Sequence, residues 1–293
     1  KENPFRQCIH LSNIQYSGTL SDPKYMSGYD KSGSGSSALT ELNCIYEVET
    51  NTIISGCKNT VIPDFITGFG ESAFYGMGIE YIYIPKTVTT FGAKSLYNVK
   101  QVFLESEVNP LTDKTSNYCD RAMTGIYKIY ERNSVVYAIY KTENEYTATV
   151  VYAVKSTFET NGVGGKVTIL SYIDIDTWNI AYVTKINDYV FSNCTEIKEI
   201  VLASDEADMR LAEIGEGAFK GCSSLIVSCW TTSIKKVGKD AFVGTTVSMI
   251  RFYEIEKGKE FEGVEIGDGN ETLTGSASKL YYDKDHPLPE TII

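Results

Sequence analysis

The stretch IGEGAFKGCSSL (Ile214–Leu225) decides the fold, because its first half recurs along the chain. Each copy begins with an apolar residue, usually followed by glycine, and ends on Phe or Leu. The copies are FGESAF (69–74), FGAKSL (91–96), INDYVF (186–191), IGEGAF (214–219) and VGKDAF (237–242). Successive copies start 22, 95, 28 and 23 residues apart, so a period near 23 is interrupted once. Such a period is typical of proteins whose repeats stack on one another.

A second signature follows four of the copies: apolar residues that alternate with others over a short run. Alternation with period two predicts a half-buried strand. A turn and a strand in each repeat bury too little apolar surface to fold alone, so neighbouring coils must stack. We therefore expect a column of buried, stacked phenylalanines at Phe74, Phe191, Phe219 and Phe242. The alternating residues are Ile79, Ile82 and Ile84; Val99, Val102 and Leu104; Ile197, Ile200 and Leu202; and Val247, Ile250 and Phe252.

The repeat resembles the BspA-like leucine-rich repeat family. IGEGAFKGCSSL follows the family pattern closely, and SGCKNTVIPDFITGFGESAFYG (Ser55–Gly76) is similar to one of its coils. The resemblance implies an α/β fold: a right-handed, β-rich solenoid with one short strand and a short helix or turn per coil. Three features depart from the pattern: Ser228 replaces an inward Ile, Leu170 replaces a Pro, and Tyr172–Tyr182 is an insertion.

The chain is predicted to have five parts. Within the third part, Ile126–Tyr130 and Ser134–Tyr140 flank Glu131–Asn133 as a β-hairpin, and Tyr146–Val154 is a third strand candidate. Lys31–Ser37 is flexible by composition. The parts are an N-terminal extension or cap (1–43), repeat block 1 (44–104), a β insert or connector (105–165), repeat block 2 (166–252) and a C-terminal cap (253–293).

Composition limits the possible partners. The formal net charge of −11 argues against nucleic acid and against anionic membranes. No apolar run reaches the ~20 residues of a membrane-spanning helix, so we expect no membrane insertion. The chain begins at Lys1 rather than Met, which a removed export signal or a trimmed chain would explain. We expect an extracellular or cell-surface location.

The sequence offers little for catalysis, so we expect neither an enzyme nor a cofactor. The two histidines, His10 and His286, lie near the ends, and no nucleophile, phosphate-binding or zinc-protease motif occurs. The seven cysteines contain no CxxC pair and cannot all pair, so at least one thiol should be free. Cys194 and Cys222 occupy one repeat position and should be buried and reduced. Acidic clusters, including Asp268–Glu271, are interpreted as solvated loops, and no metal site is expected.

Strand alternation predicts a binding face. If Ile82 and Ile84 point inward, Tyr81 and Tyr83 point outward. Seven of ten outward positions are apolar or aromatic, which is typical of an interaction site. The alternative is that the termini or the insert cover this face. The hypothesised protein-binding residues are Tyr81, Tyr83, Phe103, Val201, Met249 and Arg251, and the remaining outward positions are Gln101, Glu199, Val227 and Cys229.

The resemblance implies a secreted or surface bacterial protein, and some members of the family adhere to host matrix proteins or other cells. A protein partner is therefore expected. The alternative is a carbohydrate-binding module, because 21 tyrosines are present and seven of them lie between Tyr118 and Tyr152. A broad, flat apolar patch would favour a protein partner, and a shallow groove lined with aromatic residues would favour a glycan. A converging carboxylate pair in a cleft would favour an enzyme.

Overall fold

A computed structural model of the chain describes residues 3, 5, 7–15, 24–29, 40–111, 122–155, 165–206, 208–275 and 277–288. The chain divides into two compact units, Lys1–Ile126 and Tyr127–Ile293. The division falls inside the predicted connector, 105–165. In the part of the chain that the structure describes, strands and turns dominate, and α2 (Glu271–Thr274) is a helix of only four residues. The described part of the fold is therefore β-rich with almost no helix: of the short helix or turn expected in each coil of an α/β fold, the turn is the form that occurs.

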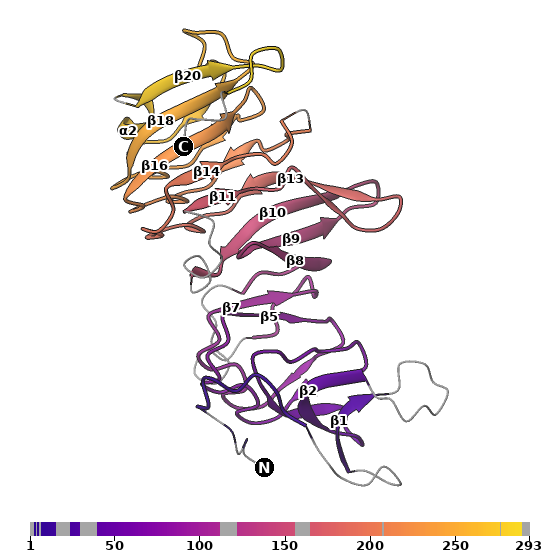
Figure 1. The fold of residues 1–293 in the computed structure, drawn as a ribbon. Helices are drawn as coiled ribbons and strands as arrows, with labels where there is room; N and C mark the ends of the chain where they lie inside the picture. The colour runs from indigo at the N-terminus through magenta and orange to yellow at the C-terminus, as the bar shows by residue number, and fades with distance from the viewer. Residues whose placement is uncertain are drawn as a thin grey trace. The chain divides into compact units, whose positions relative to one another are not determined.

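Unit 1 contains the strands β1 to β7 (Figure 1). One sheet has the order β1-β2-β3-β4-β6, in which the first three strands are antiparallel and β3, β4 and β6 are parallel. The other sheet is the parallel pair β5-β7. The strands are β1 (Tyr25–Tyr29), β2 (Thr40–Glu47), β3 (Thr52–Gly56), β4 (Gly68–Phe69), β5 (Tyr81–Ile84), β6 (Thr90–Phe91) and β7 (Gln101–Leu104).

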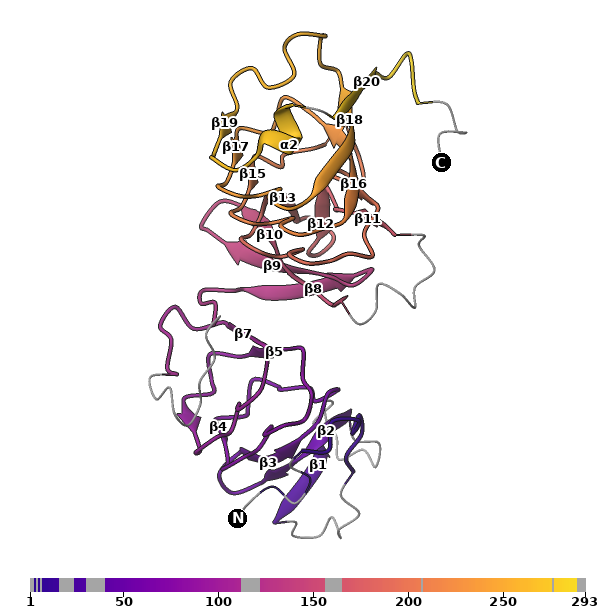
Figure 2. The ribbon, with the colours of Figure 1, turned by 90° about the vertical axis from the view of Figure 1, so that its left-hand side faces the viewer.

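Unit 2 contains two long ladders, which lie on two sides of the unit (Figure 2). One is β8-β9-β10-β13-β15-β17-β19, with β12 beside β13; the other is the parallel sheet β11-β14-β16-β18-β20. The strands are β8 (Lys128–Arg132), β9 (Val135–Lys141), β10 (Tyr146–Ala153), β11 (Lys166–Thr168), β12 (Tyr172–Asp174), β13 (Ile180–Ile186), β14 (Glu199–Val201), β15 (Glu213–Ile214), β16 (Ser224–Trp230), β17 (Lys236–Val237), β18 (Thr246–Tyr253), β19 (Glu265–Ile266) and β20 (Ser278–Tyr282).

The hairpin predicted before the second repeat block is present, but its turn is Asn133–Ser134 rather than Glu131–Asn133. β8 and β9 pair antiparallel, and Asn133 and Ser134 turn the chain with φ of 51° and 67°, the left-handed pair that a two-residue hairpin turn requires. The third candidate strand is β10, which pairs antiparallel with β9 and parallel with β13. The insertion Tyr172–Tyr182 is also a hairpin, formed by β12 and β13. The sheet of the insert is thus continuous with a ladder of the repeats.

The predicted phenylalanine column is present in unit 2. The rings of Phe191 and Phe219 stack with centroids 5.3 Å apart, and those of Phe219 and Phe242 with centroids 5.1 Å apart. All three side chains are fully buried. Phe74 is fully buried too, but it belongs to unit 1 and meets Phe69 edge-on. The column confirms the register of the repeat within unit 2.

The Ala-Phe segments are turns rather than helices, because their backbone amides bond to the next coil. The N–H of Phe191 donates to the carbonyl of Ala218, and that of Phe219 donates to Ala241, both at 2.8 Å. A helix would direct these groups to a carbonyl four residues earlier. The third residue after the repeat's first apolar position is also left-handed, as at Asp240 with φ of 56°. A left-handed residue ends any helical turn.

The glycine of the repeat allows neighbouring coils to approach closely. A Cβ on Gly238 would lie 2.5 Å from the backbone nitrogen of Glu216 and 2.6 Å from the carbonyl carbon of Gly215. Real Cβ contacts are not this short, so only glycine fits without displacing the backbone. The Ile-Gly dipeptide therefore sets the spacing of the coils.

Both ladders of unit 2 continue past residue 252, where block 2 was predicted to end. β19 pairs with β17, and β20 pairs with β18. The segment IGDGNE at 266–271 is a further repeat turn, in which Asn270 stands at the alanine position. Asn270 is buried, and its Oδ1 accepts the hydrogen bond of Phe242 N–H at 3.0 Å. The 253–293 segment thus begins with another coil, and Asn270 caps the turn ladder.

Candidate functional site

The outer face of the β11-β14-β16-β18-β20 sheet carries the candidate site. Because side chains alternate along a strand, the inward column of this sheet is Val167, Ile200, Val227 and Ile250, which pair in register and are buried. Two outward columns flank it. They are Lys166, Glu199, Ile226 and Met249, and Thr168, Val201, Ser228 and Arg251.

The register of β16 differs from the prediction by one residue. Val227 was expected outward but pairs with Ile200 and is fully buried, whereas Ser228 pairs with Val201 and faces out. Cys229 was also expected outward, but it is buried at an irregularity of the strand with φ of 61°. The sequence SLIVSCW has apolar residues at both odd and even positions, so alternation alone cannot determine which of its side chains point inward.

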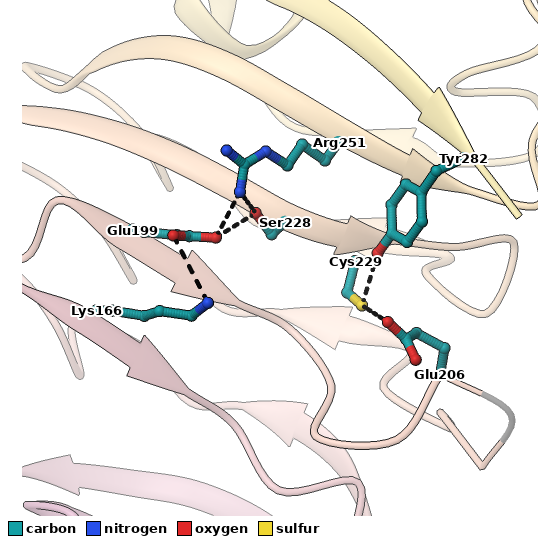
Figure 3. A network of polar contacts seen from close by, with 7 residues as sticks. All are labelled: Lys166, Glu199, Glu206, Ser228, Cys229, Arg251 and Tyr282. Carbon is teal, nitrogen blue, oxygen red and sulfur yellow. Dashed lines mark hydrogen bonds and ion pairs between the residues drawn. The ribbon is translucent and has the colours of Figure 1, made fainter. Parts of the chain in front are cut away.

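A charged pair lies on this face and is largely shielded from solvent (Figure 3). Arg251 Nη1 lies 2.9 Å from Glu199 Oε1, and the two side chains are only 7% and 17% exposed. Ser228 Oγ donates to the same carboxylate oxygen at 2.7 Å, and Lys166 Nζ lies 3.9 Å from Glu199 Oε2. A buried charge is tolerated only when it is paired and hydrogen-bonded. Glu199 therefore holds Arg251 in one orientation at the floor of the face.

A second group of polar side chains lies beside the pair (Figure 3). Cys229 Sγ is 3.0 Å from the hydroxyl of Tyr282 and 3.4 Å from Glu206 Oε1. Burial raises the pKa of the Cys229 thiol to about 12, and burial also raises the pKa of Tyr282. Both groups are therefore protonated at neutral pH, and a protonated thiol is a poor nucleophile. The arrangement suits hydrogen bonding rather than covalent chemistry.

These groups line a hollow of about 410 Å³. Its walls carry both charge signs and two tyrosines, and the segment after β20 forms one side. That segment therefore borders the face. The alternative that the termini or the insert cover the face thus holds for part of it, at the C-terminal end. The lining residues are Lys166, Glu199, Val201, Glu206, Ser228, Cys229, Arg251, Tyr253, Tyr282, Asp283, Lys284, Pro287 and Leu288.

The six hypothesised binding residues fall in both units. Val201 and Arg251 line the hollow, and Met249 lies half-buried in the outward column that also holds Lys166. Arg251 is buried, so its predicted exposure is wrong because its charge is paired with Glu199. Lys166 also lines the hollow but was not predicted to belong to the site. Alternation along its strand could have placed it on the outer face, beside Glu199.

The other three residues lie on the β5-β7 pair of unit 1. Tyr81 and Tyr83 are half-buried, and their strand pairs in register with β7. Phe103 is fully buried, packs 5.9 Å from the Tyr81 ring and pairs with Met123 in a parallel bridge. Its predicted exposure is wrong, because the chain beyond β7 adds another rung to the ladder. Gln101, also expected outward, is buried.

The cysteines that the structure describes are free thiols. Cys194 and Cys222 are buried, as predicted, and burial raises the pKa of their thiols to about 12 and about 11. Cys119 lies outside the described residues. Among the residues described, no three His, Cys, Asp or Glu side chains gather as a metal site would require, and no helix has the length and hydropathy of a membrane crossing.

Comparison with known proteins identifies the family. The model for the BspA type leucine-rich repeat region matches in six copies, over residues 1–103, 50–127 and 168–260. These ranges cover more than half of the chain, so the chain belongs to this family, as the sequence resemblance indicated. No curated protein sequence matches the chain.

One solved structure that the chain is similar to is a leucine-rich cell surface protein from Faecalibacterium prausnitzii A2-165. The identity is 17%, the TM-score is 0.31, and the match covers 53% of this chain and 51% of that one. The chain thus matches about half the length of that protein.

Proposed function

We propose that the chain is a right-handed leucine-rich repeat solenoid at the bacterial cell surface or outside the cell, where it mediates adhesion by binding a protein partner. The outer face of the β11-β14-β16-β18-β20 sheet is the contact surface. Membership of the BspA type family supports the repeat architecture. The family resemblance supports the location and an adhesive role towards host matrix or cell-surface proteins.

The observation that carries the proposal is the hollow on the outer face. Its floor holds the Arg251–Glu199 pair, which is already desolvated and fixed in orientation before any partner arrives. Tyr253 and Tyr282 pack with ring centroids 5.2 Å apart at its side. Tyrosine and arginine are enriched where protein interfaces bind most strongly, because they combine large contact area with hydrogen bonding. A preorganised site loses less conformational entropy on binding.

A carbohydrate partner is the second candidate, and a different groove of unit 2 favours it. This groove has a volume of about 310 Å³ and is lined by the half-buried Tyr130 and Tyr172, together with Arg132 and Asn133, above the fully buried Tyr137. Aromatic faces beside hydrogen-bonding side chains suit a sugar ring. The N–H of Leu170 donates to the Tyr137 hydroxyl at 3.1 Å, so this tyrosine is held in place.

The test is a capture assay of the full chain against a panel of purified extracellular-matrix proteins, run beside a glycan array. A chain with Lys166→Glu and Tyr253→Ala should lose at least about tenfold in capture by the matrix protein that retains the wild type. The matched control is Lys58→Glu with Tyr97→Ala, at exposed positions of unit 1. Capture by no matrix protein, or equal loss in both variants, would contradict the proposal. Binding confined to the array would favour the carbohydrate.

A further inference from the structure

Trp178 is the most exposed of the large apolar side chains that the structure describes, at 90%. It lies at the end of the β12–β13 hairpin, which projects from unit 2 (Figure 1). Exposing a whole indole to water is unfavourable, and a tryptophan of this kind is typical of a residue that binds a partner. Tyr127 and Ile180, at the same end of the sheet, are also exposed, at 41% and 37%.

The turn that carries Trp178 is held by hydrogen bonds. Asp176 Oδ1 accepts from the backbone N–H of Trp178 at 2.9 Å and from that of Asn179 at 3.0 Å. The Asn179 side-chain amide also donates to this carboxylate, and Ile175 N–H donates to Asn179 C=O at 2.9 Å. These bonds fix the backbone that projects Trp178 outward.

A second hairpin ends beside this one. β10 and β13 are parallel with Tyr146 opposite Ala181, so the β9–β10 turn and the β12–β13 turn lie at the same end of the sheet. The pKa of Asp176 lies below its usual value, chiefly because its carboxylate accepts hydrogen bonds from the Trp178 N–H and the Asn179 side chain, and the charge of Lys141, at the end of β9, lowers it further. The ammonium of Lys141 lies 5.4 Å and 5.5 Å from the ring centroids of Tyr127 and Tyr146.

The charge at this end is predominantly negative. Four exposed carboxylates lie on the two turns or at the strand ends beside them. The exposed cations nearby are Lys141, Lys128 on β8, two strands beyond β10, and Arg210, whose guanidinium lies 3.4 Å from the ring centroid of Tyr182. The chain as a whole has a net charge of −11. We define the hairpin-tip surface as Trp178 together with these carboxylates, Glu143, Glu145, Asp174 and Asp176.

We propose that the hairpin-tip surface binds an arginine- or lysine-rich segment of a partner protein, with one cationic side chain stacked on Trp178. An indole face attracts a cation, and guanidinium stacks on it especially well. The neighbouring carboxylates pair with the other basic side chains and speed their approach. This surface uses the ends of β9, β12 and β13, so it is separate from the outer face on which the proposed adhesion rests.

The chain provides its own probe, because it has two tryptophans and the other, Trp230, is fully buried. Titration with a hexa-arginine peptide should change the fluorescence of Trp178 in a saturable way, and hexa-glutamate should not. The affinity, measured by calorimetry, should fall roughly tenfold in Trp178→Ala and again in Glu143→Gln with Glu145→Gln. Salt at about 0.5 M should weaken binding, because it screens exposed charges.

The matched controls lie in unit 1: Tyr97→Ala for the aromatic side chain and Glu49→Gln for an exposed carboxylate. Both should bind hexa-arginine as the wild type does. Equal weakening in Glu49→Gln and in the tip variants would mean diffuse attraction to an acidic protein, and the proposal would be wrong. A Trp178 response to a neutral oligosaccharide without a response to hexa-arginine would also overturn it.

Discussion

The two units fill the core of their repeats with aromatic side chains at different repeat positions. In unit 2, Phe191, Phe219 and Phe242 stack ring on ring at the last position of the repeat. In unit 1, Leu96 follows Phe74 at that position, and the aromatic contact moves to the first position. There, Phe69 and Phe91 meet edge-on with centroids 5.5 Å apart. The repeat therefore preserves a filled core rather than a fixed aromatic position, as close packing requires.

The largest expected effect comes from opening the stacked column. Phe219→Ala leaves a cavity between two rings and should lower the free energy of unfolding by ~3–5 kcal/mol. Hydrogen exchange should show the loss in unit 2 alone. Phe74→Ala is the matched change in unit 1, where the loss should appear instead. A Phe219→Ala protein that melts within about 2 °C of the wild type would show that the register of the column is wrong.

The coil spacing can be tested by adding one methyl group. Gly238→Ala should destabilise unit 2 by about 1–3 kcal/mol, because the new Cβ would overlap the backbone at Gly215 and Glu216. Gly92→Ala makes the equivalent contact in unit 1, with Glu71 N at 2.4 Å. Gly258, with no atom within 4 Å of its added Cβ, is the control and should lose only about 1 kcal/mol from its left-handed φ. Chemical denaturation would separate these values, and equal losses would refute the steric explanation.

A buried and an exposed ion pair provide a third comparison. Arg251→Leu should cost roughly 1–3 kcal/mol, below the usual cost of breaking a buried pair, because Glu199 keeps contacts with Ser228 and Lys166. In unit 1, Lys86 pairs with Glu105 at 3.0 Å but its side chain is 71% exposed. Lys86→Leu should leave the denaturation midpoint close to the wild type, since solvent screens such pairs. Similar midpoints for the two variants would mean that Arg251 is not held by Glu199.

The smallest effect concerns pH and the last coil of unit 2. The Tyr281 hydroxyl donates to Glu260, which lowers the pKa of this carboxyl from 4.5 to about 2. Because the pKa of Glu260 is lower in the folded than in the unfolded state, its ionised form stabilises the folded protein at pH values above the unfolded-state pKa. This stabilisation is lost as the pH falls towards 2. Glu260→Gln should therefore remove part of the stability change between about pH 4.5 and 2. Acid titration of Tyr281→Phe should give the same flattening, and an unchanged profile in both would disprove the assignment.

Much of the fold followed from the sequence because the repeat is periodic. Position in the repeat predicted the buried phenylalanines and the buried Cys194 and Cys222, and alternation on both sides of a turn predicted the hairpin of β8 and β9. The turns could not be distinguished from short helices, since the bonds between coils that replace helical ones join residues more than 20 positions apart. The coil at 266–271 was not predicted because Asn270 stands where the other copies have Ala, Ser or Val, and Glu271 stands where they have Phe or Leu.

The candidate site was less predictable for a different reason. Alternation assigned Val201 and Met249 to the outer face, but it could not reveal that Arg251 is buried by its pairing with Glu199. The irregularity at Cys229 shifts the end of β16, and Tyr282 reaches the hollow from a strand assigned to a cap. The residues of the hollow come from five neighbouring strands. Whether they meet depends on the register of each strand, and the repeat pattern does not determine that register.

The central claim concerns the strands of the β11-β14-β16-β18-β20 sheet. Their inward side chains stabilise the fold, and the two outward columns form the surface that binds the partner. The most direct test measures melting and matrix-protein capture on one sample of the Lys166→Glu, Tyr253→Ala variant. The account predicts that capture is lost while the melting midpoint stays within about 2 °C of the wild type. Unchanged capture, or a midpoint as low as that of Phe219→Ala, would contradict it.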